Sequence, residues 1–373
     1  MESSQTAMKP KKLLLAGSHA GSTAIAIVEE IKKRKLDWEI HWIGKRFASE
    51  GKTTETLEYK NLSKYGVIFH NLESGKIQTK FTRYTIPALL KIPVGLFKSY
   101  KLVKKISPDL TLSFGSAAGA LVSLWSNYFK IPVLIHEQTA SAGRANILSS
   151  YFAKKILISR ESSTQFFNKN KTLLVGNPLN KEILNRVDLK RNTRVKTILI
   201  TGGSRGSKWI NDAVKPILPR LLEKYFVIHQ VGEGNLNEFA EIKNEIQPEG
   251  YEKYLSFGQI DPKSMAEIIS KADIIISRSG ANTICELVAL KKPAILVPIP
   301  WTYNDEATEN AKYMEELGLA RILLQKELSP QKLLHEVEEL VNNYANVIRD
   351  TENVESPDIN AAEKVVDILQ ENI

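Results

Sequence analysis

The chain is poor in cysteine and lacks long apolar runs, and each absence excludes some classes of protein. Its 373 residues include one cysteine, Cys285, so no internal disulfide can form, which fits a reducing cytoplasm. No run of about 18 apolar residues occurs, which excludes a membrane-spanning helix. The N-terminal stretch has no apolar core followed by a small-residue cleavage site, so we expect no signal peptide.

Familiar ligand motifs are also missing. The sequence has no Gly-Lys-Ser/Thr phosphate loop, no G-x-G-x-x-G fingerprint and no Asp-x-Asp pair. No set of His, Cys, Asp and Glu residues has the spacing of metal ligands. We therefore expect neither a metal ion nor a cofactor.

The charge is divided unevenly along the chain. Residues 1–180 hold 27 Lys and Arg against 12 Asp and Glu, a net +15, whereas residues 181–373 hold 24 against 30, a net −6. The basic half should face something anionic, such as a phospholipid surface, a phosphorylated substrate or a nucleic acid. No nucleic-acid motif or aromatic stacking array is present, so we expect no nucleic-acid partner.

Short apolar runs rich in β-branched residues alternate with helical patterns throughout the chain. Several runs are apolar on both faces, which predicts buried parallel strands in an α/β fold. The length predicts two domains. We expect two tandem Rossmann-like domains with a cleft between them. The predicted strands are residues 12–17, 38–44, 109–115, 131–137, 154–159, 195–203, 225–232, 272–280 and 293–300.

The division into domains follows the change of pattern near Asn177-Pro178. We expect an N-terminal domain over residues 1–178, a linker over 179–195 and a C-terminal domain over 196–350. Residues 351–373 end in an amphipathic helix, which we expect to pack back on the N-terminal domain.

Four loops follow predicted strands and carry residues suited to binding. Glycine-rich loops at 17–22 and 202–206 could bring backbone amides to a phosphate, although either also fits a tight turn. In the loop that opens a helix at 279–283, Glu286 could accept ribose hydroxyls, or it could form a capping box with Thr283. The fourth loop, 136–146, begins with three polar residues, His136, Glu137 and Gln138, which packing explains poorly.

One segment, 76–108, holds eight Lys and Arg and no acidic residue, with apolar residues between them. A basic amphipathic segment of this kind fits an anionic membrane surface. It also fits a helix that packs on the sheet and exposes a solvated basic face.

Taken in order, these loops resemble the MurG family of bacterial enzymes. The motifs HEQ…AG…N (136–146), VGNP (175–178), GGS.G….N (202–211) and SRSGA.T..E (277–286) have the order and spacing of that family, and Asn310-Ala311 matches a further motif. The family transfers N-acetylglucosamine from UDP-N-acetylglucosamine to the muramyl-(pentapeptide) pyrophosphoryl-undecaprenol lipid of peptidoglycan. The resemblance implies the two-domain GT-B architecture and a peripheral position on the cytoplasmic face of the membrane.

The resemblance also implies roles for individual residues. The C-terminal domain would hold the donor, and the N-terminal domain would receive the lipid acceptor and touch the membrane. Donor contacts would be Ser204, Ala281, Asn282, Thr283 and Glu286, and residues near the cleft would be His19, Ala20, Gly21, Thr139 and Asn146.

Some positions that are expected to face substrate depart from the family pattern. Ser22 stands where the family has its histidine, and His19 lies three positions earlier. Asn180 replaces an arginine that commonly follows the Asn-Pro turn. Glu306 and Ala307 stand where the family usually has two polar residues, often glutamines, near the sugar.

The implied reaction is an inverting, metal-independent displacement in which a base assists the acceptor hydroxyl while UDP leaves. His19 and Glu137 are both candidates for that base, and neither need act as one. The departures leave other functions open. One is a GT-B enzyme with another acceptor or a UDP-N-acetylglucosamine epimerase, and another is a UDP-sugar-binding module that has lost catalysis.

Overall fold

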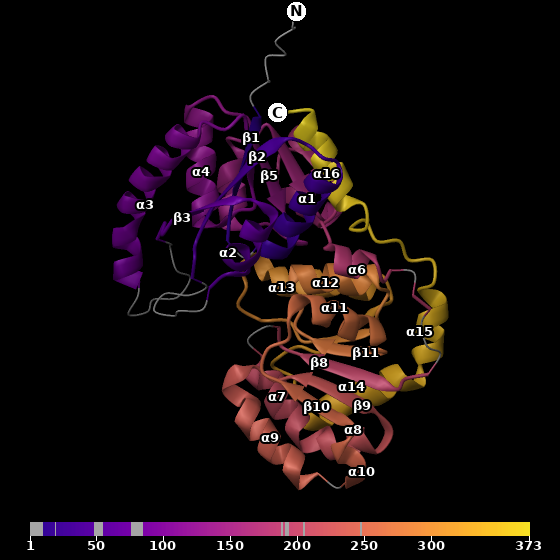
Figure 1. The fold of residues 1–373 in the computed structure, drawn as a ribbon. Coiled ribbons are helices and arrows are strands. Elements are labelled where there is room, and N and C mark those ends of the chain that lie inside the picture. The colour runs from indigo at the N-terminus through magenta and orange to yellow at the C-terminus, as the bar shows by residue number, and fades with distance from the viewer. Residues whose placement is uncertain are drawn as a thin grey trace, which may run out of the picture. The chain divides into compact units, whose positions relative to one another are not determined.

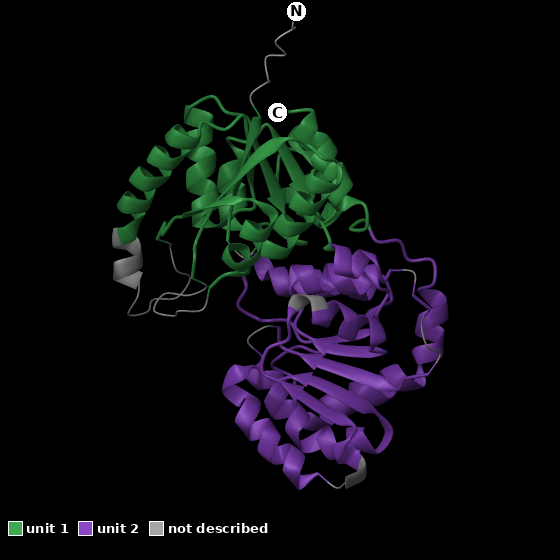
Figure 2. Ribbon diagram, viewed as in Figure 1, with its two compact units in different colours: residues 1–180, 357–373 green, residues 181–356 purple. Residues whose placement is uncertain are grey.

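The computed structural model describes residues 10–18, 20–47, 55–75, 85–187, 189–190, 194–203, 206–246 and 248–373. The chain forms two compact units: unit 1 is residues 1–180 with 357–373, and unit 2 is residues 181–356 (Figure 2). Each unit contains one wholly parallel sheet with helices on both faces. The prediction of an α/β fold with two tandem Rossmann-like domains is therefore confirmed.

Unit 1 is built on a seven-stranded sheet of order β3-β2-β1-β4-β5-β6-β7. Its central strand is apolar on both faces, and Leu13, Leu14 and Leu15 have no exposed surface, as expected for a strand covered by helices on each side. The strands are β1 (Lys11–Ala16), β2 (Trp38–Gly44), β3 (Ile68–Asn71), β4 (Leu110–Ser113), β5 (Val133–Glu137), β6 (Lys155–Ile158) and β7 (Thr172–Leu174).

Helices cover both faces of this sheet (Figure 1). One face packs against α1 and α16, and the other packs against α3 and α4. Although α16 is the last helix of the chain, Val365, Val366 and Leu369 on it are buried in the core beside α1. The helices of unit 1 are α1 (Gly21–Lys33), α2 (Leu57–Leu62), α3 (Thr85–Ile106), α4 (Ser116–Tyr128), α5 (Arg144–Ser150) and α16 (Ala361–Gln370).

Unit 2 repeats this plan with a six-stranded sheet of order β10-β9-β8-β11-β12-β13. The strands are β8 (Thr197–Thr201), β9 (Phe226–Gln230), β10 (Tyr254–Phe257), β11 (Ile274–Ser277), β12 (Ala294–Leu296) and β13 (Ala320–Ile322). The α-helices are α6 (Lys181–Leu184), α7 (Lys208–Val214), α8 (Leu218–Lys224), α9 (Leu236–Glu245), α10 (Pro248–Tyr251), α11 (Pro262–Lys271), α12 (Ala281–Ala289), α13 (Glu306–Glu316), α14 (Pro330–Asn342) and α15 (Tyr344–Asp350).

The chain passes from unit 1 to unit 2 after Asn180 and returns at Pro357. Part of the expected linker, residues 179–195, is therefore structured: α6 buries Ile183 and packs against α11 and α12 of unit 2.

The order of each sheet reverses beside its first strand, between β1 and β4 in unit 1 and between β8 and β11 in unit 2. In open parallel sheets, ligands bind at the carboxyl ends of the strands next to such a reversal. The loops that follow β1, β4, β5, β8, β11 and β12 are therefore the places to look for a site. Within the described ranges, no helix combines the length and apolarity needed to cross a bilayer.

Candidate active site

The loop after β1 is closed partly by the protein's own carboxylate. The backbone N–H of Ala20, the N-cap of α1, donates to Glu58 Oε1 at 3.0 Å, and Glu58 is buried on α2. A Cβ on Gly21 would lie 3.0 Å from Leu57 Cβ, so the glycine allows α1 and α2 to approach closely. At Ala20, an internal anion thus occupies the kind of position that was predicted for a phosphate. His19 lies outside the described residues.

Behind this loop, a buried polar cluster holds the returning C-terminal segment. Thr23 Oγ1 donates to Asn177 Oδ1 at 3.0 Å, and the Asn177 N–H donates to Asp358 Oδ1 at 2.7 Å. Arg160 and Asp358 form a two-point ion pair at 2.7 Å, with the two side chains 4% and 0% exposed. These contacts explain Asn177 of the VGNP motif structurally. Asn180, the last residue of this part of unit 1, is partly exposed.

His136, at the end of β5, is a structural histidine. Its side chain is fully buried, and Nε2 lies 3.0 Å from the carbonyl oxygen of Gly176. Burial lowers the pKa of His136 to about 4, so the ring is neutral near pH 7 and Nε2–H donates to that carbonyl. Gly176 has φ +89°, and a Cβ there would lie 2.3 Å from the carbonyl oxygen of Pro357.

Glu137 organises the loop that follows β5. Its Oε1 accepts hydrogen bonds from the N–H and hydroxyl of Thr139 at 3.2 and 2.9 Å. Its Oε2 accepts from the N–H of Gly143 and from Asn146 Nδ2, both at 2.9 Å. Three predicted site residues, Glu137, Thr139 and Asn146, are therefore brought together by one buried carboxylate with four donors. The arrangement fixes the loop.

The loop between β4 and α4 adds residues that the sequence analysis missed. Gly115 and Ser116 have φ +82° and +65°, and the second value is unusual for a residue with a side chain. Ser116 Oγ and Asn146 Oδ1 are buried without a hydrogen-bond partner among the described residues. A Cβ on Gly115 would lie 3.0 Å from Asn146 Oδ1, so the two loops touch. The signal in the sequence was the glycine that ends the predicted strand 109–115.

In unit 2, the loop after β8 needs its glycines for packing. A Cβ on Gly206, which has φ +70°, would lie 2.1 Å from the carbonyl oxygen of Val231. Gly203, by contrast, has open space around it. Asn211 Nδ2 donates to the same Val231 oxygen at 2.9 Å, which explains the asparagine of this motif. Ser204 lies outside the described residues.

The loop after β11 opens α12 with Ala281, Asn282 and Thr283, all partly exposed. The N-cap of α12 is Gly280, and Thr283 lies inside the first turn. A capping box between Thr283 and Glu286 would require Thr283 to be the N-cap residue. Because α12 already begins at Ala281, that alternative is wrong.

Glu286 lies one turn along α12 and is available to a ligand. Its carboxylate accepts no hydrogen bond from the described residues, and burial raises its pKa to about 7. A shielded carboxylate without an internal partner is suited to accept hydrogen bonds from hydroxyl groups.

The start of α13 is tied to the same loop. Ser279 Oγ donates to the carbonyl oxygen of Ala307 at 2.6 Å, and Asn310 Nδ2 donates to the carbonyl oxygen of Ser279 at 3.2 Å. The Ala307 side chain is buried, whereas Glu306 is partly exposed. Both positions therefore belong to the strand-end region of unit 2, and only Glu306 presents side-chain surface to solvent.

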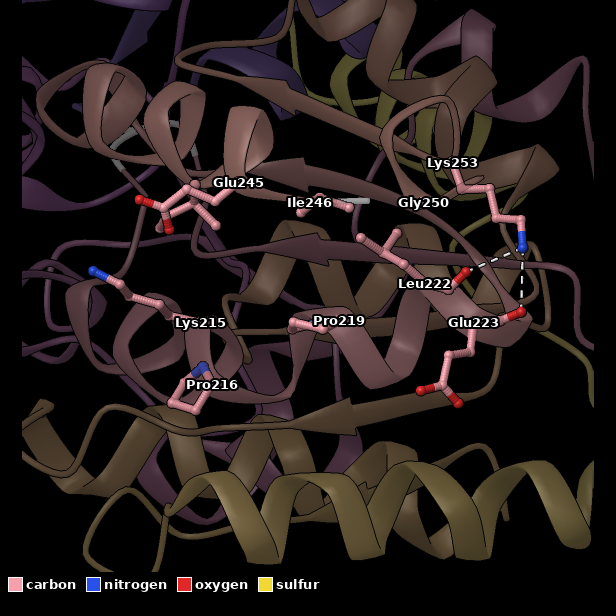
Figure 3. A pocket seen from close by; sticks show the side chains of 10 residues that line it. Lys215, Pro216, Pro219, Leu222, Glu223, Glu245, Ile246, Gly250 and Lys253 are labelled. Carbon is pink, nitrogen blue, oxygen red and sulfur yellow. Dashed lines mark hydrogen bonds between the residues drawn. The ribbon is translucent and has the colours of Figure 1, made fainter. Parts of the chain in front are cut away.

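A cavity of about 870 Å³ lies elsewhere in unit 2, between α8, α9 and α10 (Figure 3). It is lined by apolar residues such as Leu222 and Ile246, and Lys253 Nζ donates to the carbonyl oxygens of Leu222 and Glu223. These residues precede β9 and β10, so the cavity lies toward the amino ends of the strands. The candidate residues lie at the opposite, carboxyl ends. No group of three or more His, Cys, Asp and Glu residues in the described part of the chain could hold a metal ion.

Comparison with known proteins identifies related sequences along nearly the whole chain. The family model of the glycosyltransferase family 28 N-terminal domain matches residues 22–158, and that of the C-terminal domain matches residues 197–371. An enzyme of Geotalea uraniireducens is 31% identical over 369 residues, which cover 95% of this chain and 97% of that protein. Its name is UDP-N-acetylglucosamine–N-acetylmuramyl-(pentapeptide) pyrophosphoryl-undecaprenol N-acetylglucosamine transferase.

Solved structures share the fold at lower identity. MurG of Acinetobacter baumannii matches with a TM-score of 0.69 and 23% identity, covering 97% of this chain and 100% of that chain. A UDP-N-acetylglucosamine 2-epimerase from Neisseria meningitidis, bound to UDP-N-acetylglucosamine, matches with a TM-score of 0.67 and 17% identity, covering 97% and 100%. Because both identities are low, these two likenesses concern the fold, which is of the GT-B type.

Proposed function

We propose a function from one premise: the chain belongs to glycosyltransferase family 28 and, within it, to the MurG family. On this basis it is a UDP-N-acetylglucosamine-dependent N-acetylglucosaminyltransferase. It transfers N-acetylglucosamine to the muramyl-(pentapeptide) pyrophosphoryl-undecaprenol lipid in peptidoglycan synthesis. The observation that carries the proposal is similarity over 95% of the chain to an enzyme of that name. The candidate residues at the carboxyl ends of both sheets support it.

The donor is assigned to unit 2. Glu286 accepts the ribose hydroxyls, since its carboxylate has no partner among the described residues. The first turn of α12 supplies backbone N–H groups and the positive end of the helix to the diphosphate. Ser204 and Glu306 are assigned to donor contact from the resemblance.

The reaction is a single displacement that inverts the configuration at C1 of the sugar. The acceptor hydroxyl oxygen forms a bond to C1 while the bond from C1 to the UDP oxygen breaks, and the electron pair leaves with UDP. The hydroxyl proton passes to a base. No metal is required in this proposal, because helix N-termini and backbone amides meet the charge of the leaving diphosphate.

Of the two candidate bases, we assign the role to His19 and a positioning role to Glu137. The Glu137 carboxylate already accepts four hydrogen bonds from its own loop, and protonation would weaken them. A histidine has a pKa near neutrality when unperturbed, which suits proton transfer.

The acceptor side is assigned to unit 1, which docks peripherally on the anionic cytoplasmic face of the membrane. The inner face of α3 packs in the core through Val103 and Ile106, while Val94 and Phe97 are exposed on its outer side. Lys101 Nζ lies 4.4 Å from the centre of the Phe97 ring, so charge and apolar surface adjoin on that side. The helix thus fits both interpretations of the basic segment: one side packs on the sheet, and the other side offers basic and apolar groups to a membrane surface. Residues 76–84 of the segment lie outside the described residues.

Release of UDP tests the proposal against its rivals. Purified protein is incubated with UDP-N-acetylglucosamine, with and without a soluble muramyl-pentapeptide diphosphate acceptor. Acceptor-dependent release supports the proposed transfer. Conversion of the donor to its C2 epimer without net UDP release, followed by chromatography, supports an epimerase, the activity named for the Neisseria protein. Binding with neither UDP release nor epimer formation supports a module that has lost catalysis.

A further inference from the structure

A second cavity of unit 2, with a volume of about 610 Å³, is lined mostly by charged side chains. It is formed by the segment that follows α6, by the C-terminal part of α11 and by residues just before β11 and β12. It therefore lies toward the amino ends of the strands, whereas the residues assigned to the donor lie at the carboxyl ends. Its charged lining residues are Arg186, Lys190, Lys271, Lys292, Glu267 and Asp273.

Both acidic side chains of this lining already have partners in the protein. Asp273 Oδ2 accepts from two backbone N–H groups at the start of β8, at 2.7 and 2.9 Å. Glu267 Oε1 accepts from Lys271 Nζ, one turn further along α11. That hydrogen bond and the charge of Lys271, with a further contribution from Arg186, hold the pKa of Glu267 below its ordinary value of 4.5. The two carboxylates are thus ionised at neutral pH and held by the protein itself.

The basic side chains of the lining outnumber the acidic ones by four to two, which leaves a net charge of +2. Lys292, only 8% exposed, donates to the carbonyl oxygens of Ser270 and Ala272 at 2.6 and 2.8 Å, at the C-terminal end of α11. Arg186 NH1 donates to the carbonyl oxygen of Glu182 in α6 at 2.5 Å. Such carbonyls carry only partial charges. The cavity thus concentrates positive charge in the half of the chain whose net charge is −6.

This distribution of charge favours an anionic ligand that carries more than one charge. A concave surface with one excess sign of charge raises the local concentration of ions of the opposite sign. The planar guanidinium of Arg186 and the ammonium groups of Lys190 and Lys271 come from two separate segments, so they can approach different oxygens of one phosphate. The cavity volume lies within the range of about 300–1,000 Å³ that is typical of small-molecule sites.

We propose that this cavity binds the phosphate group of an organic phosphate between the segment after α6 and the end of α11. The inference goes beyond the proposed function and does not depend on it, because the donor residues lie at the opposite ends of the strands. The chain enters unit 2 directly before α6, so a ligand held here ties the entering segment to α11. A soluble phosphate ester and a lipid headgroup share this chemistry, and the test separates them.

Calorimetry with pyrophosphate as the probe tests the inference, with UDP-N-acetylglucosamine present at saturation to fill the donor site. Changing Arg186 and Lys271 together to Gln should weaken pyrophosphate binding about ten-fold or more, because two charged donors are lost. Glu267→Gln should strengthen it several-fold, because a negative charge leaves the lining. The matched control changes Arg220 and Lys312 to Gln, since both are exposed, paired with a glutamate and outside this lining.

A wild type that binds no pyrophosphate, or that binds it no better than the double variant, would overturn the inference. An equal loss in the control variant would overturn it as well, because attraction to any surface charge would then explain the binding. If the double variant does not fold, Glu267→Gln decides, and unchanged or weaker binding in that variant contradicts the inference.

Vesicles that contain phosphatidic acid identify the source of the phosphate. We expect the double variant, Arg186→Gln with Lys271→Gln, to bind them as the wild type does, which assigns the site to a soluble phosphate. Weaker vesicle binding in that variant would assign the site to a lipid headgroup. A wild type that binds pyrophosphate as expected but not UDP-N-acetylglucosamine would refute the proposed function and leave this inference standing.

Discussion

The two units use charge at their strand ends in opposite ways. In unit 1, buried carboxylates serve the protein itself: Glu58 accepts the Ala20 N–H, and Glu137 accepts four hydrogen bonds from its loop. In unit 2, neither the acid Glu286 nor Arg278, which directly follows β11, has an ion-pair partner in the described ranges. The same fold thus holds satisfied charges at one sheet and unsatisfied charges at the other.

This difference distinguishes a loop that is fixed in advance from a site that waits for a ligand. A carboxylate whose donors come from its own loop holds the backbone in place before any substrate arrives. A carboxylate or guanidinium without an internal counter-ion keeps hydrogen-bonding capacity for the hydroxyl or phosphate groups of a ligand, at a cost in stability of the free protein. The contrast between the units therefore supports the proposal that unit 1 carries the chemistry and positions the acceptor while unit 2 binds the donor.

The largest effect is expected from His19→Ala, which tests the chemical half of this comparison. Turnover should fall by roughly 10²-fold or more while the affinity for UDP-N-acetylglucosamine stays nearly unchanged, because a base acts in the transition state only. Single-turnover rates with saturating donor and acceptor measure this. His19→Gln should not restore the rate, since an amide cannot accept the proton. A full rate in His19→Ala would remove the residue from the chemistry.

Glu137→Gln tests whether the carboxylate fixes its loop. The glutamine amide has one NH2 group in place of one carboxylate oxygen. That group would face the donors of Gly143 and Asn146 or those of Thr139, so buried hydrogen bonds would be lost. We expect a loss of about 2–4 kcal/mol in the free energy of unfolding of unit 1, measured by urea denaturation.

The control for this loss is Glu161→Gln, at an exposed position of the same unit. It should change stability by less than about 0.5 kcal/mol. A Glu137→Gln protein as stable as the control, with turnover reduced to the level of His19→Ala, would move the base to Glu137.

The surface of unit 1 can be tested through its exposed lysines. Changing Lys98, Lys101, Lys104 and Lys105 to Gln should weaken binding to vesicles that contain anionic phospholipid by more than about ten-fold, at roughly 1 kcal/mol per basic residue. Added salt should also weaken vesicle binding, because it screens the charges. Sedimentation with vesicles measures both.

The matched control removes the same number of charges from unit 2. Changing Lys215, Arg220, Lys271 and Lys312, all exposed, should leave vesicle binding nearly unchanged. Equal binding of the wild type to neutral and anionic vesicles would contradict the electrostatic part of the proposal.

The sequence predicted the inner strands of both sheets and missed the outer ones. All nine predicted strands are present, because each is a short apolar run buried on both faces. The missed strands are β3, β7, β10 and β13, which are the four sheet edges. Their residues are largely partly or fully exposed, so their hydrophobic pattern is too weak to identify a strand.

The candidate site was predictable where motif and contact are local. Glu137, Thr139 and Asn146 lie within ten residues of one another, and their spacing indicated a common loop. The partners Glu58 and Asp358 were not predictable, since Glu58 meets Ala20 across 38 positions and Asp358 meets Arg160 across 198. Those contacts depend on how the sheets fold, and local patterns carry no information on them.

The smallest effect, and the sharpest test of the comparison, is expected from Glu286→Gln in unit 2. The folded protein holds the pKa of Glu286 at about 7, above its ordinary value of 4.5, so folding favours the protonated form. The wild type therefore loses stability as the pH rises from 4.5 through 7, whereas Glu286→Gln does not. Ligand-free Glu286→Gln should melt at a higher temperature than the wild type at pH 8 and at the same temperature near pH 4.5, the opposite of the loss expected for Glu137→Gln.

The affinity of Glu286→Gln for UDP should change in the other direction. It should be several-fold weaker than that of the wild type at pH 8, because an ionised carboxylate accepts hydroxyl hydrogen bonds better than an amide. In the wild type that advantage should shrink as the pH falls below 7. Glu315→Gln, at an exposed position on α13, should show neither change. Equal melting temperatures at pH 8 for wild type and Glu286→Gln would mean that the carboxylate has a partner in solution, and the contrast between the two units would be lost.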